Sequence, residues 1–123
     1  MAATVPGARH GERVTVTIVI VVMSQAWTLD AGPHLDGYVA AYEAFLELHR
    51  EQPGFRGRQL LHSTDEPCHL VNLRFFDRAA DYDALIARPG YAEHIAALGE
   101  HLDLERTPIK EMLDVVIDDG PAR

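Results

Sequence analysis

The sequence has 123 residues, of which 47% are hydrophobic and 24% charged, which is enough for the core of one soluble domain. Its formal net charge of −8 repels phosphate backbones and anionic lipid, so neither nucleic acid nor a membrane is an expected partner. The single cysteine, Cys68, excludes an internal disulfide and a thiolate metal cluster. It also fits a reducing compartment, so we expect a cytoplasmic protein without a bound metal.

The first predicted element is a strand that is apolar on both faces. Residues 1–13 contain Arg9 and Arg13 without the apolar stretch and cleavage site of a signal peptide, and we expect a disordered tail there. Residues 14–22 are rich in β-branched side chains and predict a strand. Both of its alternating sets are apolar, so both faces must be covered. Because the helices of so short a chain can cover only one face, we expect a second subunit on the other.

Helical and strand patterns alternate over the rest of the chain. After a predicted loop over 24–32, apolar residues recur at helical spacing from Pro33 to about Glu51. The remaining predicted elements are a hairpin of strands over 55–63 and 69–76, helices over 79–87 and 91–101, a strand over 109–117 and a polar tail over 118–123. The order β-α-β-β-α-β is typical of an α+β ferredoxin-like domain, a split βαβ with a four-stranded antiparallel sheet, expected over 14–117. Two such sheets facing each other would form a dimeric α+β barrel around an apolar pocket.

A set of short motifs is spread over roughly Val14 to Ile117. It comprises Pro53-Gly54-Phe55, the hairpin, Phe75-Phe76-Asp77, Tyr82 and the segment from Arg88 to His94. In this set the chain resembles the antibiotic biosynthesis monooxygenase family, whose members are small dimeric α+β barrel proteins. They include cofactor-free oxygenases that turn polyketide anthrones into quinones and haem-degrading monooxygenases, and a related group with the same barrel acts as aromatic polyketide cyclases. The resemblance implies an enzyme that uses molecular oxygen as co-substrate and needs no cofactor.

The anthrone oxygenases of that family carry an asparagine on the third strand, a tryptophan four residues later and a tyrosine ten residues after the asparagine. Asn72 and Tyr82 match this spacing, while Phe76 stands at the tryptophan position and lacks the indole N–H donor. The resemblance therefore implies catalytic roles for Asn72 and Tyr82. Haem is not expected, because Thr15, Thr17 and Phe76 stand where the haem degraders carry asparagine and tryptophan.

The polar residues of this segment each have two interpretations. If the alternating set around Leu73 packs on the helices, Asn72 and Arg74 point into the barrel. Asn72 then binds a substrate carbonyl or phenol, or it bonds a neighbouring strand or side chain. Arg74 holds an enolate or phenolate, or it forms a salt bridge to an acidic residue such as Asp114. Tyr82 donates its hydroxyl to a substrate oxygen, or it is a helix tyrosine with a buried ring.

Histidine and aromatic side chains complete the candidate site. Trp27 is a candidate lid in its predicted loop, and His94 is a candidate general base because imidazole titrates near physiological pH. For each histidine the alternative is an ordinary surface or core position. The expected catalytic residues are Asn72, Tyr82 and His94, and the expected substrate-binding residues are Arg74, Phe76, Trp27, Tyr91 and His62.

Motifs for common cofactors are missing from the sequence. No glycine-rich phosphate loop, nucleophile elbow or zinc motif is present, so no nicotinamide, flavin, nucleotide or zinc site is expected. The leading hypothesis is a homodimeric, cofactor-independent monooxygenase that oxidises a polycyclic aromatic polyketide or similar electron-rich phenol. The alternatives are a non-redox aromatic polyketide cyclase or isomerase, and a ligand-binding accessory protein without chemistry. An RNA-binding ferredoxin-like domain is disfavoured by the negative charge.

Overall fold

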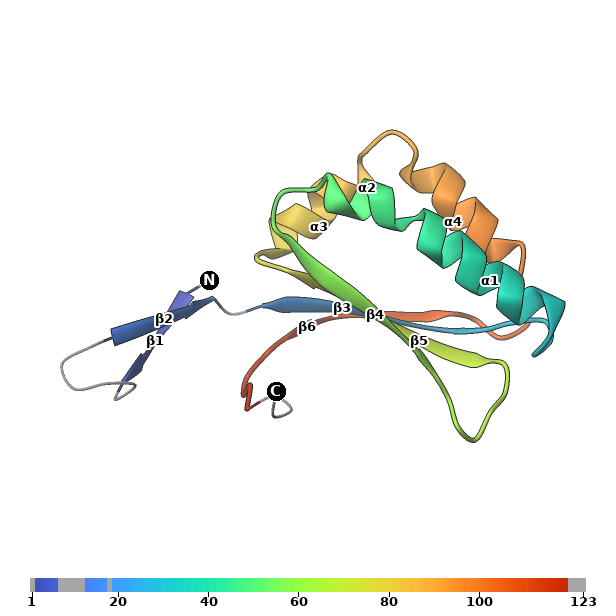
Figure 1. Ribbon diagram of the computed structural model, residues 1–123, viewed down its shortest axis with the longest axis horizontal. Coiled ribbons are helices and arrows are strands. Elements are labelled where there is room, and N and C mark those ends of the chain that lie inside the picture. The colour runs from blue at the N-terminus through green and yellow to red at the C-terminus, as the bar shows by residue number, and fades with distance from the viewer. Residues whose placement is uncertain (1, 7–12, 18, 120–123) are drawn as a thin grey trace.

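A computed structural model of the chain describes residues 2–6, 13–17 and 19–119. Its main unit is a four-stranded antiparallel sheet with strand order β4-β5-β3-β6, covered on one side by helices (Figure 1). The strands are β3 (Ile20–Trp27), β4 (Phe55–His62), β5 (His69–Phe76) and β6 (Ile109–Asp114). The helices are α1 (Pro33–Ala44), α2 (Leu46–Arg50), α3 (Ala79–Ile86) and α4 (Tyr91–Gly99). This confirms the α+β ferredoxin-like fold predicted from the order of the sequence patterns.

The beginning of the chain differs from the prediction. Strands β1 (Ala2–Pro6) and β2 (Arg13–Thr17) pair antiparallel in a separate two-stranded sheet, where the sequence analysis expects a disordered tail over 1–13. Both segments contain β-branched residues, and pairing satisfies the backbone groups of each. The strand predicted over 14–22 is consequently divided between β2 and β3. Residues 1 and 7–12 of the predicted tail lie outside the described residues.

Strand β3 continues to Trp27, through a segment that the sequence pattern assigns to a loop. The pattern is misleading because Ser24 is polar although it lies in the middle of the sheet. Ser24 pairs with Asn72 on β5 and with Lys110 on β6. Backbone pairing on both sides therefore holds the strand together at a point where a row of polar side chains crosses the sheet.

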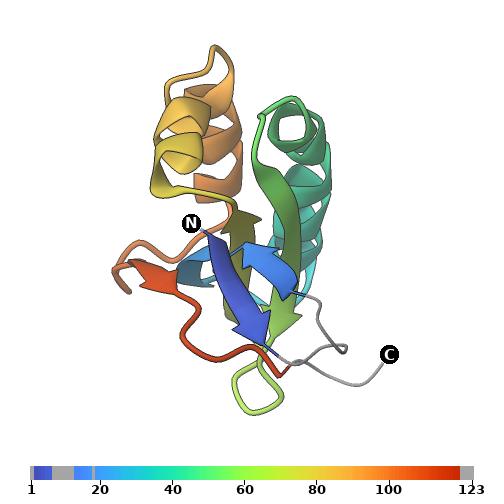
Figure 2. The ribbon, with the colours of Figure 1, turned by 90° about the vertical axis from the view of Figure 1, so that its left-hand side faces the viewer.

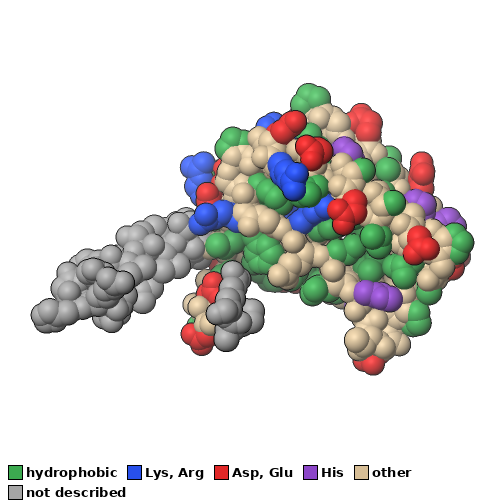
Figure 3. All heavy atoms as spheres, in the orientation of Figure 1, with side chains coloured by type: hydrophobic (Ala, Val, Ile, Leu, Met, Phe, Trp, Pro, Cys, Tyr) green, Lys and Arg blue, Asp and Glu red, His purple; other side chains and the backbone are tan. Residues whose placement is uncertain are grey.

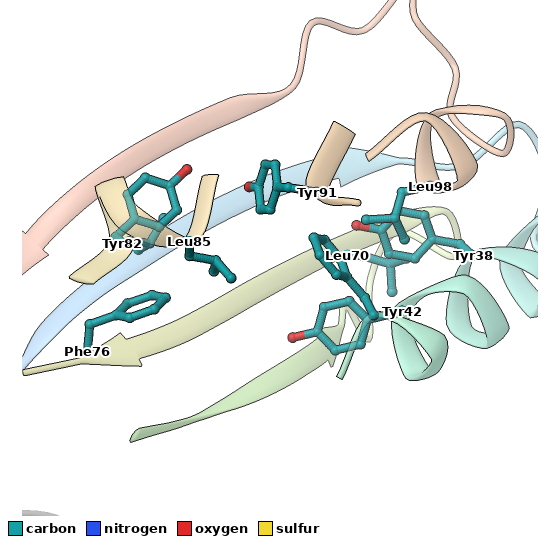
Figure 4. Packing of buried hydrophobic residues seen from close by; sticks show 10 residues of the cluster. Tyr38, Tyr42, Leu70, Phe76, Tyr82, Leu85, Tyr91 and Leu98 are labelled. Atoms are coloured by element: carbon teal, nitrogen blue, oxygen red, sulfur yellow. The ribbon is translucent and has the colours of Figure 1, made fainter. Parts of the chain in front are cut away.

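The helical layer consists of two rows on the same face of the sheet. Seen from the end in Figure 2, α1 and α2 form one row and α3 and α4 the other. The core lies between these rows and the sheet and is rich in aromatic rings (Figure 4). Its buried members are Val22, Tyr38, Tyr42, Phe45, Leu70, Phe76, Tyr82, Leu85, Tyr91 and Leu98.

The turn that joins α2 to β4 depends on Gly54. This residue has a φ of +87°, which favours glycine. A Cβ at this position would also overlap the carboxylate of Asp81 at the start of α3. The motif Pro53-Gly54-Phe55 is therefore a requirement of chain geometry at the point where the two helical rows meet the sheet.

The two faces of the sheet carry the opposite sets from those predicted for β5. Leu70, Asn72, Arg74 and Phe76 are buried beneath the helices, while the alternating set around Leu73 is half-buried on the face that no helix covers. The prediction that Asn72 and Arg74 point into a space between two sheets is wrong. Leu70 and Phe76, at the two ends of the first set, supply the apolar contacts to the helices, and they carry the polar residues between them to that side.

Two negative findings hold for the part of the chain that the structure describes. None of its helices has the length and apolar character needed to cross a membrane. No three His, Cys, Asp or Glu side chains within it come together as metal ligands.

Candidate functional site

A cavity of about 330 Å³ lies between the sheet and the helical layer, within a single chain. Its walls come from β3, β5 and β6 below and from α1, α4 and the segment 102–108 above and beside them. The lining residues are Ser24, Gln25, Ala26, Tyr38, Phe45, Asn72, Arg74, Tyr91, Ile95, Leu98, Gly99, Leu102, Leu104, Pro108, Ile109 and Lys110. A volume of this size, mostly apolar with a few converging polar groups, is typical of small-molecule sites.

The polar floor of the cavity follows from strand register. Asn72, Ser24 and Lys110 are cross-strand neighbours on β5, β3 and β6, so their side chains project from the same face of the sheet in one row. Arg74 lies two residues further along β5 on that face. Four polar side chains from three strands therefore face the same apolar chamber.

Asn72 is held by a hydrogen bond that leaves its amide nitrogen available. The Tyr42 hydroxyl donates to Asn72 Oδ1 from helix α1. Burial raises the pKa of Tyr42 to about 12, so this hydroxyl keeps its proton and remains a donor at neutral pH. Within the described part of the chain, Asn72 Nδ2 donates to no protein acceptor. Asn72 thus presents a fixed N–H donor to the cavity.

Arg74 is a buried cation with only neutral partners. It is 3% exposed, its Nη1 donates to the Tyr91 hydroxyl at 3.2 Å, and its guanidinium lies 5.2 Å from the centre of the Tyr82 ring. Its Nε is buried and has no hydrogen-bond partner among the residues that the structure describes. Among the described residues no carboxylate forms an ion pair with Arg74, so the interpretation as a salt bridge to Asp114 is wrong.

Lys110 places a second cation beside the first. Its Nζ lies 4.6 Å from the centre of the Tyr82 ring, on which Arg74 also packs. Burial of the amino group and the positive charge of Arg74 both lower the pKa of Lys110. The Tyr82 hydroxyl itself is buried without a partner within the described structure. Figure 4 shows Tyr82 and Tyr91 projecting from α3 and α4 toward this region, opposite Tyr38 and Tyr42 of α1.

Three of the predicted site residues line the cavity: Asn72, Arg74 and Tyr91. Tyr82 and His94 lie behind its wall, where Tyr82 underlies the two cations and His94 stacks on the Phe45 ring with 4.7 Å between ring centres. The structure therefore brings Tyr82 and His94 close to the cavity without exposing them on its surface.

Phe76 does not contact the cavity. It is fully buried between the rings of Phe55 and Tyr82, at centroid distances of 5.8 and 5.6 Å. The missing indole donor at this position is thus a change in the core beneath α3, and no hydrogen-bond donor is lost from the cavity lining.

Trp27 and His62 lie elsewhere. Trp27 ends strand β3 on the face that no helix covers, stacked on His69 with 4.7 Å between ring centres and donating from Nε1 to Glu66 at 3.0 Å. The prediction of a loop-borne lid is wrong for Trp27, because it is paired within the sheet. His62 is exposed, its Nε2 lies 2.6 Å from the Pro67 carbonyl, and it lines a different groove between α1 and β4.

The sequence patterns did not identify three parts of the site: Lys110, Ser24 and the Tyr42–Asn72 hydrogen bond. Lys110 is the only lysine of the chain, and it lies in β6, whose residues are all solvent-exposed, at the rim of the cavity. Because the chain has no other lysine, Lys110 could have been singled out from the sequence as a candidate site residue. The helical spacing of Tyr42 predicts a core residue, and its ring does lie in the core. Its hydroxyl, however, also positions Asn72, which faces the cavity.

His49 is a buried histidine in the same helical row. It is 0% exposed, and its Nδ1 lies 2.9 Å from the Phe45 carbonyl, to which the neutral ring donates. Burial lowers the pKa of His49 from 6.5 to about 4, so the imidazole is neutral at physiological pH. It packs edge-on against Phe45, outside the lining of the cavity.

Fold and cavity together define a ferredoxin-like α+β protein with a cavity of about 330 Å³ under its helices. Solved structures share this fold. One is a variant of SnoaB, a cofactor-independent oxygenase from Streptomyces nogalater, at a TM-score of 0.69 and 17% identity over 86% of this chain and 100% of that one. Another, described as antibiotic biosynthesis monooxygenase, matches at a TM-score of 0.66 and 17% identity over 80% and 99% of the two chains.

A third similar structure is Rv0793 from Mycobacterium tuberculosis, at a TM-score of 0.66 and 22% identity over 83% of this chain and 99% of that one. No model of a protein family matches the sequence. No curated protein matches it either. The resemblance to antibiotic biosynthesis monooxygenases predicted from short motifs is thus confirmed at the level of the fold.

Proposed function

We propose that this chain is a cofactor-independent monooxygenase that oxidises a polycyclic aromatic polyketide or similar electron-rich phenol, in the manner of an anthrone becoming a quinone. The observation that carries the proposal is the fixed, unbonded amide N–H of Asn72 in an apolar chamber beside a buried cation. The cofactor-independent oxygenase SnoaB, whose fold this chain shares, supports the same reading.

In the proposed reaction, a base removes an acidic proton from the bound substrate and leaves a carbanion or enolate. Asn72 Nδ2 and the Arg74 guanidinium stabilise the negative charge as it develops on the substrate oxygen. The anion then transfers one electron to molecular oxygen, and the substrate radical and superoxide combine through a new C–O bond. Protonation of the peroxide, loss of the remaining C–H proton and cleavage of the O–O bond give the quinone and one water.

The base is a water held by Asn72 or the imidazole of His94. The water has the more direct position, because Asn72 lines the cavity whereas His94 lies behind the Phe45 ring. Tyr82, whose buried hydroxyl lies behind the cavity wall, is the proposed source of the returned proton. Phe76 and Trp27 lie off the cavity lining, so the proposal gives neither a contact with the substrate.

An oxygen electrode tests this function directly. Purified protein with dithranol, a dihydroxyanthrone, is expected to consume oxygen faster than the spontaneous reaction, with one oxygen used per quinone formed and no free peroxide. Labelled oxygen gas should place its isotope in the new carbonyl. Uptake at the spontaneous rate with several anthrones would contradict the proposal.

A non-redox cyclase or isomerase of poly-β-ketone intermediates is the second candidate. Two cations and an amide donor stabilise an enolate equally well when no oxygen takes part, and this arrangement is what favours the alternative. Turnover of a poly-β-ketone surrogate under argon would assign the protein to this class, and dependence of turnover on oxygen would assign it to the first.

The proposal includes a homodimer joined through the sheet face that carries no helices. Met23, Leu73 and Phe75 form a half-buried apolar surface there beside the buried Val21, flanked by the exposed Leu61 and Leu113. In the view of Figure 3, hydrophobic side chains gather along the lower part of the body, where the sheet lies, while charged side chains mix over the helical layer. A second copy of the same surface would cover it.

A further inference from the structure

Two neighbouring arginines of the sheet have different surroundings. Arg58 and Arg74 are cross-strand partners on β4 and β5, and both side chains are nearly buried. Arg58 donates to the Tyr42 carbonyl and forms an ion pair with Glu43 at 3.6 Å. Arg74 has a tyrosine hydroxyl, the face of an aromatic ring and an unbonded Nε. Arg58 is therefore neutralised by the fold, and Arg74 is not.

Lys110 adds a second positive charge near Arg74, which makes the surroundings of the two arginines still more different. A guanidinium remains protonated in proteins, so Arg74 is a permanent positive charge, and Lys110 brings another to the same tyrosine ring. None of the described residues that line the cavity is an aspartate or glutamate. This is unexpected in a chain with 19 acidic and only 11 basic residues, where acidic partners are plentiful.

The energetic consequence is a site that lacks its counter-charge. A buried ion without a counter-charge destabilises the folded chain, and a like charge beside it adds to that cost. Aromatic faces and a hydroxyl offset part of it, but they do not neutralise two cations. A negatively charged group inside the cavity would supply the missing counter-charge to both Arg74 and Lys110.

We propose that the substrate of this cavity carries a carboxylate, bound by the Arg74 guanidinium and Lys110 Nζ, in addition to the aromatic part that reacts. The inference rests on the proposed function for the aromatic part and goes beyond it in naming a permanent anionic group. Two donors suit the two oxygens of a carboxylate, and the aromatic walls formed by Tyr38, Phe45 and Tyr91 suit a flat ring system.

The test compares two ligands that differ only in this group. Rhein is a dihydroxyanthraquinone carboxylate, and aloe-emodin is the same ring system with a hydroxymethyl group instead. Isothermal titration calorimetry is expected to show that rhein binds at least about tenfold more tightly, the contribution of one charge-assisted hydrogen bond. Both ligands are already quinones, so binding can succeed or fail whether or not the protein oxygenates anthrones.

Substitutions test which residues cause the preference for rhein over aloe-emodin. Arg74→Gln and Lys110→Gln should each reduce the rhein preference to roughly threefold or less, since each removes one of the two cations. Arg50→Gln is the matched control, because it removes the same charge from an exposed helix position 64% accessible to solvent. The control should keep the full preference for rhein.

A stability measurement makes the test independent of either ligand. If Arg74 lacks a counter-charge, Arg74→Met should melt at a higher temperature than the wild-type chain in the absence of ligand. The proposal is overturned if the two ligands bind equally, if neither binds, or if rhein keeps its preference in both variants. A lower melting temperature for Arg74→Met would equally overturn it, since Arg74 would then be a structural residue.

Discussion

The two faces of the sheet reverse the usual relation between polarity and exposure. The face covered by helices carries Ser24, Asn72, Arg74 and Lys110 around the cavity. The face without helices carries the apolar set around Leu73, open to solvent in the single chain. Polar groups are normally solvated and apolar groups buried, so each face has an arrangement that the isolated chain does not explain.

We infer from this difference that the two faces have different functions. The helix-covered face stores unsatisfied donors and positive charge, and such groups are retained where a ligand satisfies them. The open face offers a mainly apolar surface, with Gln59 and Glu111 beside Leu73 and Met23, and such surface is retained where another protein surface covers it. We therefore propose that the chemistry takes place within the individual chain and that two copies meet through the opposite side of the same strands.

Leu73→Glu tests the open face and has the largest expected effect. In a symmetric dimer the substitution buries two unpaired carboxylates, each costing several kcal/mol, so the dissociation constant should rise by roughly 10⁴-fold. Sedimentation velocity or light scattering would show a monomer at micromolar concentration. Ile86→Glu is the matched control, because Ile86 is 42% exposed on helix α3 in the covering layer. A dimer that survives Leu73→Glu would place the contact between copies elsewhere.

Asn72→Ala tests the covered face. Loss of one preorganised donor to an oxyanion typically costs about 10²- to 10³-fold in rate, and we expect this loss in oxygen uptake with dithranol. The variant should still fold, because the side chain lies beside a cavity and its removal leaves space that water can enter.

The control for Asn72→Ala is Gln59→Ala, which truncates another amide on the adjacent strand, at an exposed position on the opposite face. It should leave the rate unchanged. If Asn72→Ala also kept the wild-type rate, the amide would be a structural residue and the chemistry would need a different anion-stabilising group.

The fold was predictable because element order depends on strong local patterns. Helical spacing from Pro33, the hairpin around residues 63–68 and the last strand from Ile109 place the elements after residue 32 within a few residues, whereas the first strand of the unit was predicted too early in the chain. Asn72 and Arg74 were also identifiable, since two polar residues in an otherwise apolar strand need partners. The resemblance to a family added Tyr82 and His94, which the structure places behind the cavity.

The side on which the site lies was not predictable, because alternation separates two faces without saying which one the helices cover. Lys110 was missed for a related reason. Its position in the cavity depends on pairing with Ser24 across the sheet, and that strand segment reads as a loop from its polarity alone. Trp27 was misplaced by the same error, since a strand that reaches residue 27 carries its last side chain to the open face.

The buried His49 makes the stability of the folded chain depend on pH. Its pKa is about 4 in the folded chain and 6.5 for an ordinary histidine, so protonation favours the unfolded state. The stability that depends on neutral His49 is complete above about pH 6.5 and is lost as the pH falls toward 4, by roughly 3 kcal/mol in total. Urea unfolding across this range should show the loss in the wild-type chain and a smaller loss in His49→Leu. If the free energies of unfolding of the wild-type chain and of His49→Leu differed by the same amount at every pH, the assignment to His49 would be contradicted.

Tyr42→Phe has the smallest expected effect and separates positioning from direct catalysis. The variant removes only the hydroxyl that donates to Asn72 Oδ1 and keeps the ring beneath the Arg58 guanidinium. One net hydrogen bond is worth about 1 kcal/mol, so we expect a small loss of stability and roughly a tenfold fall in kcat. KM should change little, because the ring that lies against the core remains. Asn72→Ala combined with Tyr42→Phe should then be no slower than Asn72→Ala alone, since the hydroxyl acts only through the amide. Additive losses would instead mean that the hydroxyl of Tyr42 acts on the substrate itself.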